Sequence, residues 1–529
     1  MAGDVRRLLV IVFLCGAALM ALEMAGVRVL NVYFGSTHYV WGAIIGLFLG
    51  ALAAGYFLGG IIADRFPTFR ALGLIIAASG ACHFLIPVIA RPLCEWLSKG
   101  GEGGGMDPRW QALVGSLVLY GLPSLLLGMV SPFAVRLAAR TVEDMGRVAG
   151  RLYAISTAGS LAGTFAVSFF LVEWFGNLTI IVGIGAVLLV SAALAFWRPG
   201  ASAATMLAAA LVATALFRGV DMGMSVPSWF HNKKVLEQFD SPYHHVIVLE
   251  SDNYSAEGRA RYLLFNSLTQ SGIRIGTPEW DAAVTPAAEY VHMLNLGQVF
   301  QDRAPENLCI IGCGGGVGPM LFRRTYPEIR RIDVVDIDPC VFDMARKHFG
   351  YRDDDGVIAS HVCDGRLFLR NTERKYDAII LDAYSAGGRI PWHLVTDGFM
   401  GTVKERLAPG GVMLMNVISA IEGPHSRLLQ AVHRTAAGVF PSVYLFPRYR
   451  MSEGFGPTTT SNMFIVATLD TERHEPAAVL ERYRARLGGA VRMDHLLDPV
   501  VACRSSIAYA PGTPVLTDDY APTDSMTFR

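Results

Sequence analysis

A glycine-rich loop between two hydrophobic runs is the part of this sequence best suited to bind a nucleoside. In LCIIGCGGGVGP, residues 308–319, a loop rich in glycine follows the first run directly and includes Gly312, Gly314 and Gly316. Glycines let the backbone turn tightly and approach a ligand closely. Asp336 ends the next hydrophobic run, in VVDIDP, where it is placed to accept ribose hydroxyls, and Ile337 follows it. The spacing suits S-adenosylmethionine as well as a dinucleotide.

Two further carboxylates follow hydrophobic runs in the same part of the chain. Asp364 stands in VCDGRLFL beside Gly365, and Asp382 stands in YDAIILDAYS. In a doubly wound sheet the carboxyl ends of the strands face one crevice. We therefore expect Asp336, Asp364 and Asp382 to converge on a single ligand.

The elements around these residues alternate between strand and helix patterns. Strands are predicted at 308–311, 332–336, 378–381, 412–417 and 463–467, with helices at 341–348 and 427–437. This order predicts an α/β Rossmann-like domain of the S-adenosylmethionine-methyltransferase type, with a doubly wound, mostly parallel sheet. Strand patterns at 246–250 and 262–266 predict a small β-hairpin subdomain ahead of it.

The first part of the chain has a different character. The 529 residues are 52% hydrophobic and the mean hydropathy is +0.38, too apolar for a purely soluble protein. Six runs approach the ~20 residues that cross a bilayer as a helix, at 8–30, 39–62, 71–90, 112–138, 152–172 and 178–197. A shorter, Ala-rich run at 203–217 is left open as a span, a half-span or an interfacial segment.

These patterns predict four regions. A multi-span membrane domain of six to eight helices covers 1–217, and a linker covers 218–235. The small β-rich subdomain covers 236–300, and the Rossmann-like domain covers 301–529. The first apolar run is too long for a cleavable signal peptide and carries Glu23 and Arg28, so we expect it to be retained.

The distribution of basic residues predicts the orientation in a cell (inner) membrane. One set of span ends carries nine arginines, against three basic residues at the other ends: Arg6, Arg7, Arg65, Arg70, Arg136, Arg140, Arg147, Arg151 and Arg198, against Arg91, Lys99 and Arg109. The positive-inside rule then places the amino terminus in the cytoplasm. We expect an even number of crossings, so that the catalytic domain is also cytoplasmic, where S-adenosylmethionine is supplied.

The net charge and the cysteine spacing argue against some classes of binding partner. The chain has 45 basic and 45 acidic residues, which argues against a nucleic-acid partner. The eight cysteines show no CxxC spacing and no metal is predicted; they resemble small buried thiols of a reducing compartment. Cys313 is favoured as a packing residue over a nucleophile.

Functional and structural roles are weighed for several polar residues, and a packing role is predicted for a set of glycines. Glu23 and Arg28, inside the first run, are functional candidates, or else Glu23 pairs within the bundle and Arg28 reaches the helix end. Packing or surface roles are favoured over metal binding for four histidines, at His244, His245, His292 and His393. Close helix packing is predicted at Gly42, Gly46, Gly50, Gly55 and Gly59.

Residues 241–467 resemble the spermidine synthase family of aminopropyltransferases. SPYHHVIVLE resembles the family's S-x-Y-Q strand, YLLFNSLTQSG its LxLDGxxQ segment, and YVHML its YHEML segment. The glycine loop corresponds to the family's GGGDGG motif, and VVDIDP corresponds to its VEIDP motif. CDGRLFL and LDAYSAGGRIP correspond to the family's DAxxFL and DSSDPxGP motifs. With the apolar runs and the closing TDDYAP at 517–522, the chain resembles the membrane-integral spermidine-synthase-like proteins.

The resemblance implies roles for particular residues. Gln270, Asp336 and Asp364 would bind the nucleoside, with Asp364 on the adenine amino group. Asp382 and Tyr290 would face the attacking amine, and Asp382 would take its proton. The sulfonium nucleoside is then a substrate, either S-adenosylmethionine or its decarboxylated form, methylthioadenosine is the product, and no prosthetic group is needed.

Departures from the family leave the reaction open. The family's ammonium-binding acids are replaced at Gly315, Ser385, Pro286, Ala287 and His292. A buried ammonium without a partner costs several kcal/mol, which argues against putrescine as acceptor. Intact S-adenosylmethionine then allows aminocarboxypropyl transfer or internal displacement by its own carboxylate. A methyltransferase and a transporter or sensor that only binds the nucleoside are the alternatives, and a homo-oligomer stays open.

Overall fold

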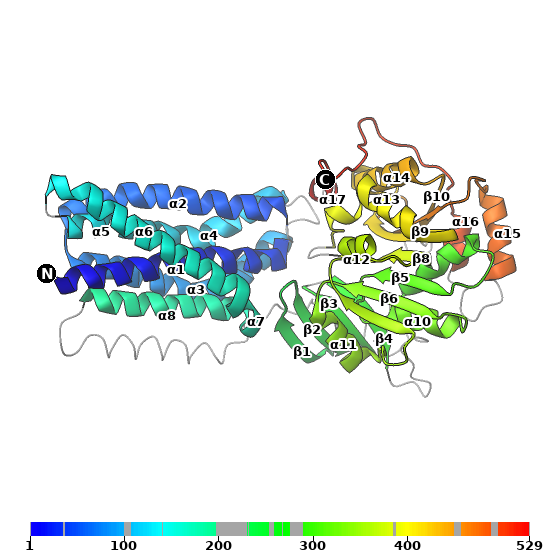
Figure 1. The fold of residues 1–529 in the computed structure, drawn as a ribbon, viewed down its shortest axis with the longest axis horizontal. Helices are drawn as coiled ribbons and strands as arrows, with labels where there is room; N and C mark the ends of the chain where they lie inside the picture. Colours follow the sequence, from blue (N-terminus) through cyan, green and yellow to red (C-terminus); the bar gives the residue numbers. More distant parts are fainter. Residues whose placement is uncertain are drawn as a thin grey trace. The chain divides into compact units, whose positions relative to one another are not determined.

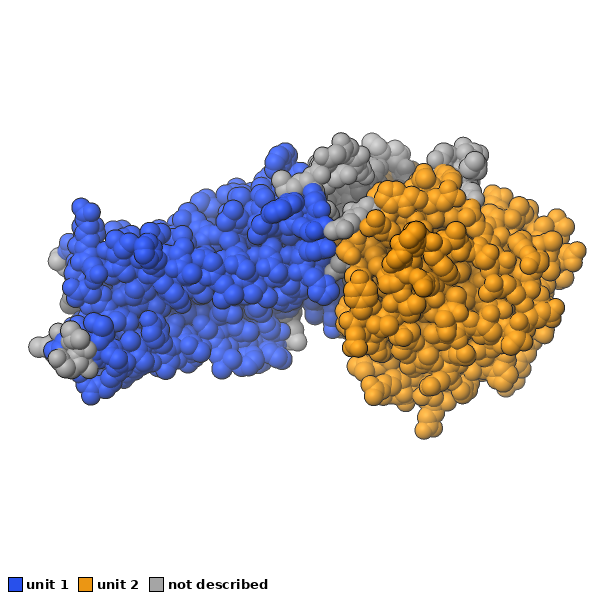
Figure 2. All heavy atoms as spheres, turned by 90° about the horizontal axis from the view of Figure 1, so that it is seen from above, with its two compact units in different colours: residues 1–225, 239–245 blue, residues 226–238, 246–529 orange. Residues whose placement is uncertain are grey.

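The computed structural model divides the chain into two compact units (Figure 2). It describes residues 2–527 except 35–36, 100–106, 140, 197–229, 231, 253–258, 267, 276–288, 385–387, 449–455 and 488–495. The first unit comprises Met1–Ser225 with Phe239–His245, and the second comprises Val226–Gln238 with Val246–Arg529. The predicted run at 203–217 and most of the predicted linker at 218–235 lie outside the described residues.

The first unit is a bundle of long apolar helices (Figure 1). In chain order these are α1 (Ala2–Phe34), α2 (His38–Arg65), α3 (Phe69–Lys99), α4 (Pro108–Gly128), α5 (Val130–Ala138), α6 (Val142–Ala166), the π-helical η1 (Val167–Leu171), α7 (Val172–Trp174) and α8 (Asn177–Phe196). Among the described residues, six helical stretches are long and apolar enough to cross a membrane. They coincide with the six predicted runs, which confirms the runs as helices.

Helix α1 is the centre of this bundle, because it packs against α6, α8, α4 and α2. Glycines of α6 let its backbone approach α1: a Cβ at Gly163 would lie 2.1 Å from the Ala17 carbonyl oxygen. Arg28 of α1 donates to Asn177 Oδ1 of α8 at 2.9 Å. Its guanidinium therefore has a partner inside the bundle, which favours a structural role at this position.

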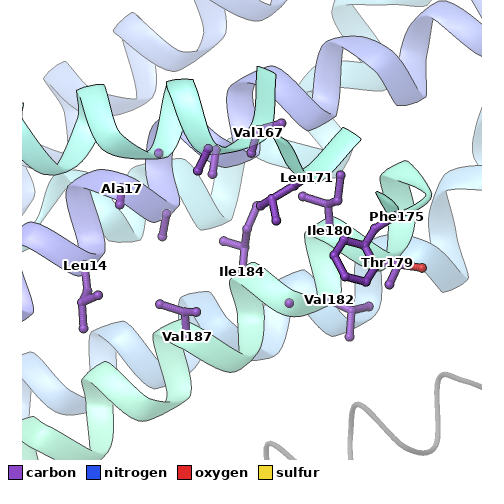
Figure 3. Close-up of a pocket in the computed structure, with 15 residues that line it drawn as sticks. Leu14, Ala17, Val167, Leu171, Phe175, Thr179, Ile180, Val182, Ile184 and Val187 are labelled. Atoms are coloured by element: carbon purple, nitrogen blue, oxygen red, sulfur yellow. The ribbon is translucent and has the colours of Figure 1, made fainter. Parts of the chain in front are cut away.

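A cavity of about 640 Å³ opens between α1, α6, η1 and α8 (Figure 3). Thr179 is the one polar side chain among the described residues that line it. The remaining wall is aliphatic or glycine apart from Phe175. This lining accommodates hydrocarbon and offers a charged ligand no partner.

The five glycines of α2 that were predicted to pack closely fall into two groups. A Cβ at Gly55 would lie 2.4 Å from the Leu125 carbonyl oxygen, and one at Gly59 would lie 2.7 Å from Met129 Cα. At Gly42, Gly46 and Gly50 an added Cβ meets nothing within 4 Å. The prediction of close packing is confirmed for the first two glycines and wrong for the other three, because those three face away from α4 and α5.

The two groups provide a matched pair within one helix. We expect Gly55→Ala to destabilise the protein by about 1–3 kcal/mol, because the new methyl group collides with backbone that cannot move. Gly46→Ala should leave stability unchanged or raise it slightly, since alanine has the higher helix propensity. Thermal unfolding of both variants in detergent measures the difference; equal midpoints would contradict the packing described above.

The second unit begins with a four-stranded sheet of order β1-β2-β3-β4. Its strands are β1 (Lys234–Asp240), β2 (His245–Ser251), β3 (Ala260–Phe265) and β4 (Leu268–Arg274). Strand β3 pairs antiparallel with β2 and β4, as a hairpin subdomain requires. The 3-10 helix η2 (Glu289–Phe300) lies in the predicted β-rich region, but it packs on β9 and β11 of the larger sheet and on the helices α10 and α15, and its residues 291–299 are buried.

The larger sheet has seven strands in the order β10-β11-β9-β8-β5-β6-β7. They are β5 (Asn307–Ile311), β6 (Arg331–Asp336), β7 (Ile358–Val362), β8 (Tyr376–Leu381), β9 (Leu407–Ser419), β10 (Ser442–Pro447) and β11 (Ser461–Thr468). Strands β5 to β9 pair parallel, and β11 is antiparallel to β9 and β10. The chain reverses its direction of strand addition between β5 and β8, which is where such sheets bind ligands.

Helices connect these strands, and in the described part of the chain three more helices follow the last strand (Figure 1). They are α10 (Val317–Thr325), α11 (Pro339–Phe349), α12 (Gly365–Asn371), η3 (Trp392–Leu394), α13 (Asp397–Arg406), η4 (Pro424–Ser426), α14 (Arg427–Val439), α15 (Pro476–Arg486), α16 (Leu497–Val501) and α17 (Thr523–Thr527). The core between β9 and α14 is built from side chains such as Met415, Val417, Leu429 and Val432, all buried.

The predicted Rossmann-like domain is confirmed as a mixed sheet. The predicted strands correspond to β2, β3, β5, β6, β8, β9 and β11, and the two predicted helices to α11 and α14. Sequence patterns missed β1, β4, β7 and β10. In β4 and β7 the residues LTQSGIR and IASHV carry polar side chains among the apolar ones. Pairing with neighbouring strands, rather than a local hydrophobic pattern, makes these segments extended.

Candidate functional site

The glycine loop joins β5 to α10 and takes backbone conformations that side chains disfavour. Gly312, Gly314 and Gly316 have φ values of 100°, 53° and 72°. A Cβ at Gly312 would lie 2.2 Å from the carbonyl oxygen of Asp382. The loop and the end of β8 are therefore in direct backbone contact, which only glycine allows.

Asp336, at the end of β6, is fastened to this loop. Its Oδ2 accepts the backbone N–H of Cys313 at 2.9 Å, and its Oδ1 accepts that of Asp338 at 3.0 Å. Burial raises the pKa of Asp336 to about 6, against the effect of these two hydrogen bonds. Each carboxylate oxygen keeps a lone pair for a ribose hydroxyl. The neighbouring Ile337 is 41% exposed and offers an apolar surface to a base.

Asp364 caps the first turn of α12. Its Oδ1 accepts the N–H of Leu367 at 2.9 Å, and its Oδ2 lies 2.8 Å from Nε2 of His393. The hydrogen bond with His393 lowers the pKa of Asp364. A Cβ at Gly365 would lie 2.5 Å from Ile311 Cγ2, so this glycine lets α12 begin directly against β5. His393, predicted as a packing or surface residue, is thus a partner of a candidate site carboxylate.

Asp382, at the end of β8, forms the third carboxylate group. Asn416 Nδ2 of β9 donates to Asp382 Oδ1 at 2.9 Å. Burial raises the pKa of Asp382, and hydrogen bonds from Asn416 and Tyr290 oppose that rise. The carboxyl group is therefore easier to protonate than an ordinary aspartate, as a proton acceptor in a reaction requires.

Tyr290, in η2, lies between the two sheets of the second unit. Its hydroxyl donates to the Gln270 carbonyl oxygen at 2.9 Å and also lies within hydrogen-bonding reach of Asp382. Because a phenol has one proton, it donates to one of these acceptors at a time. Burial, followed by the charge of Asp382, raises the pKa of Tyr290 well above its ordinary value, so the phenol stays protonated.

Gln270 approaches the site through its backbone. A Cβ at Gly314 would lie 3.6 Å from the Gln270 carbonyl oxygen. The Gln270 side-chain amide instead donates to the Leu268 carbonyl oxygen at 3.4 Å. The structure therefore brings the Gln270 backbone next to the loop.

Asn416 was not among the residues predicted for the site. Its own position is held by Asn462, which donates to Asn416 Oδ1 at 3.1 Å, and by Tyr384, which donates to its carbonyl oxygen at 2.8 Å. The signal in the sequence was a single amide within the apolar run VMLMNVIS, because a buried polar side chain needs a partner.

Of the five positions at which the family's acids are replaced, the structure describes Gly315 and His292. A Cβ at Gly315 would lie 2.9 Å from Ser271 Cβ and 3.1 Å from Phe349 Cδ1, so a longer side chain would have to displace both. His292 is buried in η2. Ser385, Pro286 and Ala287 lie outside the described residues.

The environments of Cys313 and His245 favour structural roles for these side chains. Burial raises the pKa of the Cys313 thiol well above its ordinary value, which favours the packing interpretation. His245 pairs with Asp240, and the described residues contain no cluster of three His, Cys, Asp or Glu side chains that could hold a metal ion.

The fold and the site define a Rossmann-type domain with three carboxylates at the carboxyl ends of its strands. Residues 289–466 match the model of the spermine/spermidine synthase domain. A polyamine aminopropyltransferase of Vibrio vulnificus is 30% identical over 217 residues, covering 40% of this chain and 67% of that protein. The chain belongs to the spermine/spermidine synthase family.

Two other proteins are similar to parts of the chain. Putrescine N-methyltransferase 2 of Nicotiana tabacum is 32% identical over 186 residues, covering 34% of this chain and 47% of that protein. The crystal structure of a probable spermidine synthase from Corynebacterium glutamicum aligns with a TM-score of 0.41 and 18% identity, covering 55% of this chain and 98% of that one.

The raised pKa of Asp336 predicts a pH-dependent affinity for nucleosides. When the pH falls below the Asp336 pKa of about 6, the carboxyl group becomes protonated and accepts fewer hydrogen bonds. Methylthioadenosine binding measured by calorimetry should weaken below this pKa by up to about tenfold per pH unit, and level off above it.

The control is Asp336→Asn, which keeps the shape but removes the ionisable group. We expect weaker binding that no longer changes across this pH range. A wild-type affinity that is constant from about pH 5 to about pH 7 would contradict the role of Asp336.

Proposed function

We propose that this chain is a membrane-anchored, aminopropyltransferase-type enzyme that acts on a sulfonium nucleoside and releases methylthioadenosine. The observation that carries the proposal is the position of Asp382, which has a raised pKa and lies against the glycine loop that also holds Asp336. Membership of the spermine/spermidine synthase family supports the same reaction type.

The proposed chemistry is a nucleophilic displacement. A neutral amine nitrogen attacks the carbon next to the sulfonium, the carbon–sulfur bond breaks, and its electron pair stays on sulfur as methylthioadenosine forms. The new ammonium loses a proton to the Asp382 carboxylate. Tyr290 and Asn416 orient that carboxylate, since both are within hydrogen-bonding reach of it.

The nucleoside is proposed to lie along the carboxyl ends of β5, β6 and β7, with its reacting carbon towards the end of β8. Asp336 would accept hydrogen bonds from the ribose hydroxyls, and Asp364 would accept one from the adenine amino group. Because Gly312, Gly314 and Gly316 have no side chains, the loop backbone could approach the ligand closely. Gly365, Gln270 and Ile337 would complete the contacts. No prosthetic group takes part in this proposal.

The surroundings of Gly315 bear on the choice of sulfonium substrate. The loop acid that would hold an aminopropyl ammonium is replaced, and Ser271 and Phe349 occupy the space beside Gly315. Without that acid, the carboxylate of intact S-adenosylmethionine meets no repulsion at this point of the loop. We therefore propose that the intact form is accepted as well as the decarboxylated one, and that putrescine is not the main acceptor.

Methyl transfer is the second candidate function. The observation that favours it is the 32% sequence identity to a putrescine N-methyltransferase over 186 residues. The two reactions leave different nucleosides: displacement at the aminopropyl-type carbon leaves methylthioadenosine, whereas methyl transfer leaves S-adenosylhomocysteine.

Mass spectrometry of the nucleoside product therefore tests the function. Purified protein is incubated with intact or decarboxylated S-adenosylmethionine, with and without putrescine. We expect methylthioadenosine; with intact S-adenosylmethionine it should form without a strong requirement for putrescine, because the substrate's own carboxylate can act as the nucleophile. S-adenosylhomocysteine would show methyl transfer, and spermidine formed much faster than methylthioadenosine appears without amine would contradict the proposed acceptor preference.

The same assay, with decarboxylated S-adenosylmethionine and an added amine, tests Asp382. Asp382→Asn keeps the hydrogen bond to Asn416 within reach but cannot accept a proton, so turnover should fall by roughly 10²- to 10⁴-fold. Nucleoside affinity should stay within a few-fold, which separates this variant from Asp336→Asn. Unchanged turnover would move the base elsewhere or indicate an internal displacement that needs none.

We also propose that the chain is a multi-pass protein of the cell membrane with its catalytic unit in the cytoplasm. The six helices that could cross a membrane among the described residues are an even number. The arginine-rich span ends support a cytoplasmic amino terminus under the positive-inside rule.

Reporter fusions after Arg529 measure the orientation. A reporter that works only in the cytoplasm should be active, and one that works only after export should be silent. The reverse pattern would mean an odd number of crossings and a catalytic unit that faces outward.

A further inference from the structure

A tight turn near the carboxyl end of the chain, at 517–520, lies against the helices that carry part of the candidate site. Thr517 and Tyr520 exchange backbone hydrogen bonds at 3.0 and 3.1 Å. Leu516, just before the turn, is fully buried, and its N–H donates to Thr435 Oγ1 of α14 at 2.9 Å. The turn is therefore anchored in the core and presents Asp518 at a defined position.

Asp518 makes three hydrogen bonds to two elements of the second unit. Its carboxylate accepts both terminal nitrogens of Arg366, at 2.7 and 2.6 Å, and Thr396 Oγ1 at 2.7 Å. A Cβ at Gly398 would lie 2.7 Å from Asp518 Oδ2, so glycine at that position leaves room for the carboxylate beside the first turn of α13. Bidentate contacts of this kind fix direction as well as distance.

Arg366 connects this carboxylate to the candidate nucleoside site. It stands in α12, two residues after Asp364, and it donates to the His393 carbonyl oxygen at 3.3 Å. The His393 ring in turn lies 2.8 Å from Asp364 Oδ2. Asp518, Arg366, His393 and Asp364 thus form one continuous chain of contacts.

We propose that Asp518 is a positioning residue that holds Arg366 and His393 so that Asp364 accepts the amino group of an adenine base. This inference rests on the proposed function, because it takes Asp364 as the adenine partner. A carboxylate accepts a hydrogen bond from the 6-amino group, whereas a 6-oxo purine presents an acceptor at the same place. Asp518 therefore contributes to the choice of base although it does not touch the nucleoside.

The test compares two nucleosides, methylthioadenosine and its 6-oxo analogue methylthioinosine, by calorimetry on the full-length protein in detergent. The wild type should prefer methylthioadenosine. In Asp518→Asn the affinity for methylthioadenosine should fall roughly tenfold, as expected for one weakened charge-assisted hydrogen bond, while that for methylthioinosine stays the same. Asp518→Glu should restore part of the preference, since it keeps the charge.

A matched control is Asp302→Asn. Asp302 also pairs with arginines, Arg482 and Arg486, but its side chain is 87% exposed and has no contact with the chain of residues around Asp364. This variant should bind both nucleosides as the wild type does.

The outcomes separate the inference from the proposed function. A folded Asp518→Asn variant that keeps the wild-type preference overturns the positioning role, as does an equal loss of affinity for both nucleosides. If Asp518→Asn does not fold, Arg366→Lys provides the same comparison, because lysine cannot make the bidentate contact. A wild type that binds neither nucleoside overturns the proposed function itself.

Discussion

The contact between Gly312 and the backbone of Asp382 is the constraint on which the candidate site depends. The glycine loop follows β5 and Asp382 ends β8, and these parallel strands are neighbours in the sheet. With 2.2 Å between the Asp382 oxygen and the place of a Cβ, no other residue fits at Gly312. This close approach brings the acid of β8 to the loop that also binds the carboxylate of β6.

The three strand-end carboxylates share one edge of the sheet but have different surroundings. Asp336 is half-buried and accepts backbone N–H groups, Asp364 has a histidine partner, and Asp382 is half-buried beside an amide and a phenol. Burial raises the pKa of Asp336 and Asp382, whereas His393 lowers that of Asp364. Environments that separate the pKa values of similar groups allow one site to assign them different tasks. The proposed division into ribose binding, base reading and proton transfer follows this separation.

The helical unit depends on small residues in a comparable way. Gly55 and Gly163 bring helix backbones into contact, because small residues let packed helices approach closely. The cavity between α1 and α8 is lined by aliphatic side chains and has one hydroxyl, so it differs chemically from the carboxylate-rich edge of the sheet. The two units therefore suit different kinds of molecule.

Local patterns in the sequence were sufficient for the glycine loop, for the acids at the ends of β6 and β8, and for the apolar helices. Each of these depends on the spacing of residues within about 30 positions, where strand, turn and helix periodicities operate. The pattern could not tell which glycines of α2 face a neighbour, because that depends on the rotation of the helix against α4 and α5. It also assigned His393 to packing and overlooked Asn416.

Only the tertiary structure joins residues that are far apart along the chain. Asn416 reaches Asp382 across 34 positions, His393 reaches Asp364 across 29, and Asp518 reaches Arg366 across 152. No periodicity encodes such pairs, since each depends on how strands are ordered in the sheet and how the carboxyl-terminal turn docks on α12 and α13. The sequence by itself determined which residue types are available for the chemistry; the fold decided which of them meet, because a hydrogen bond requires contact in space and not proximity along the chain.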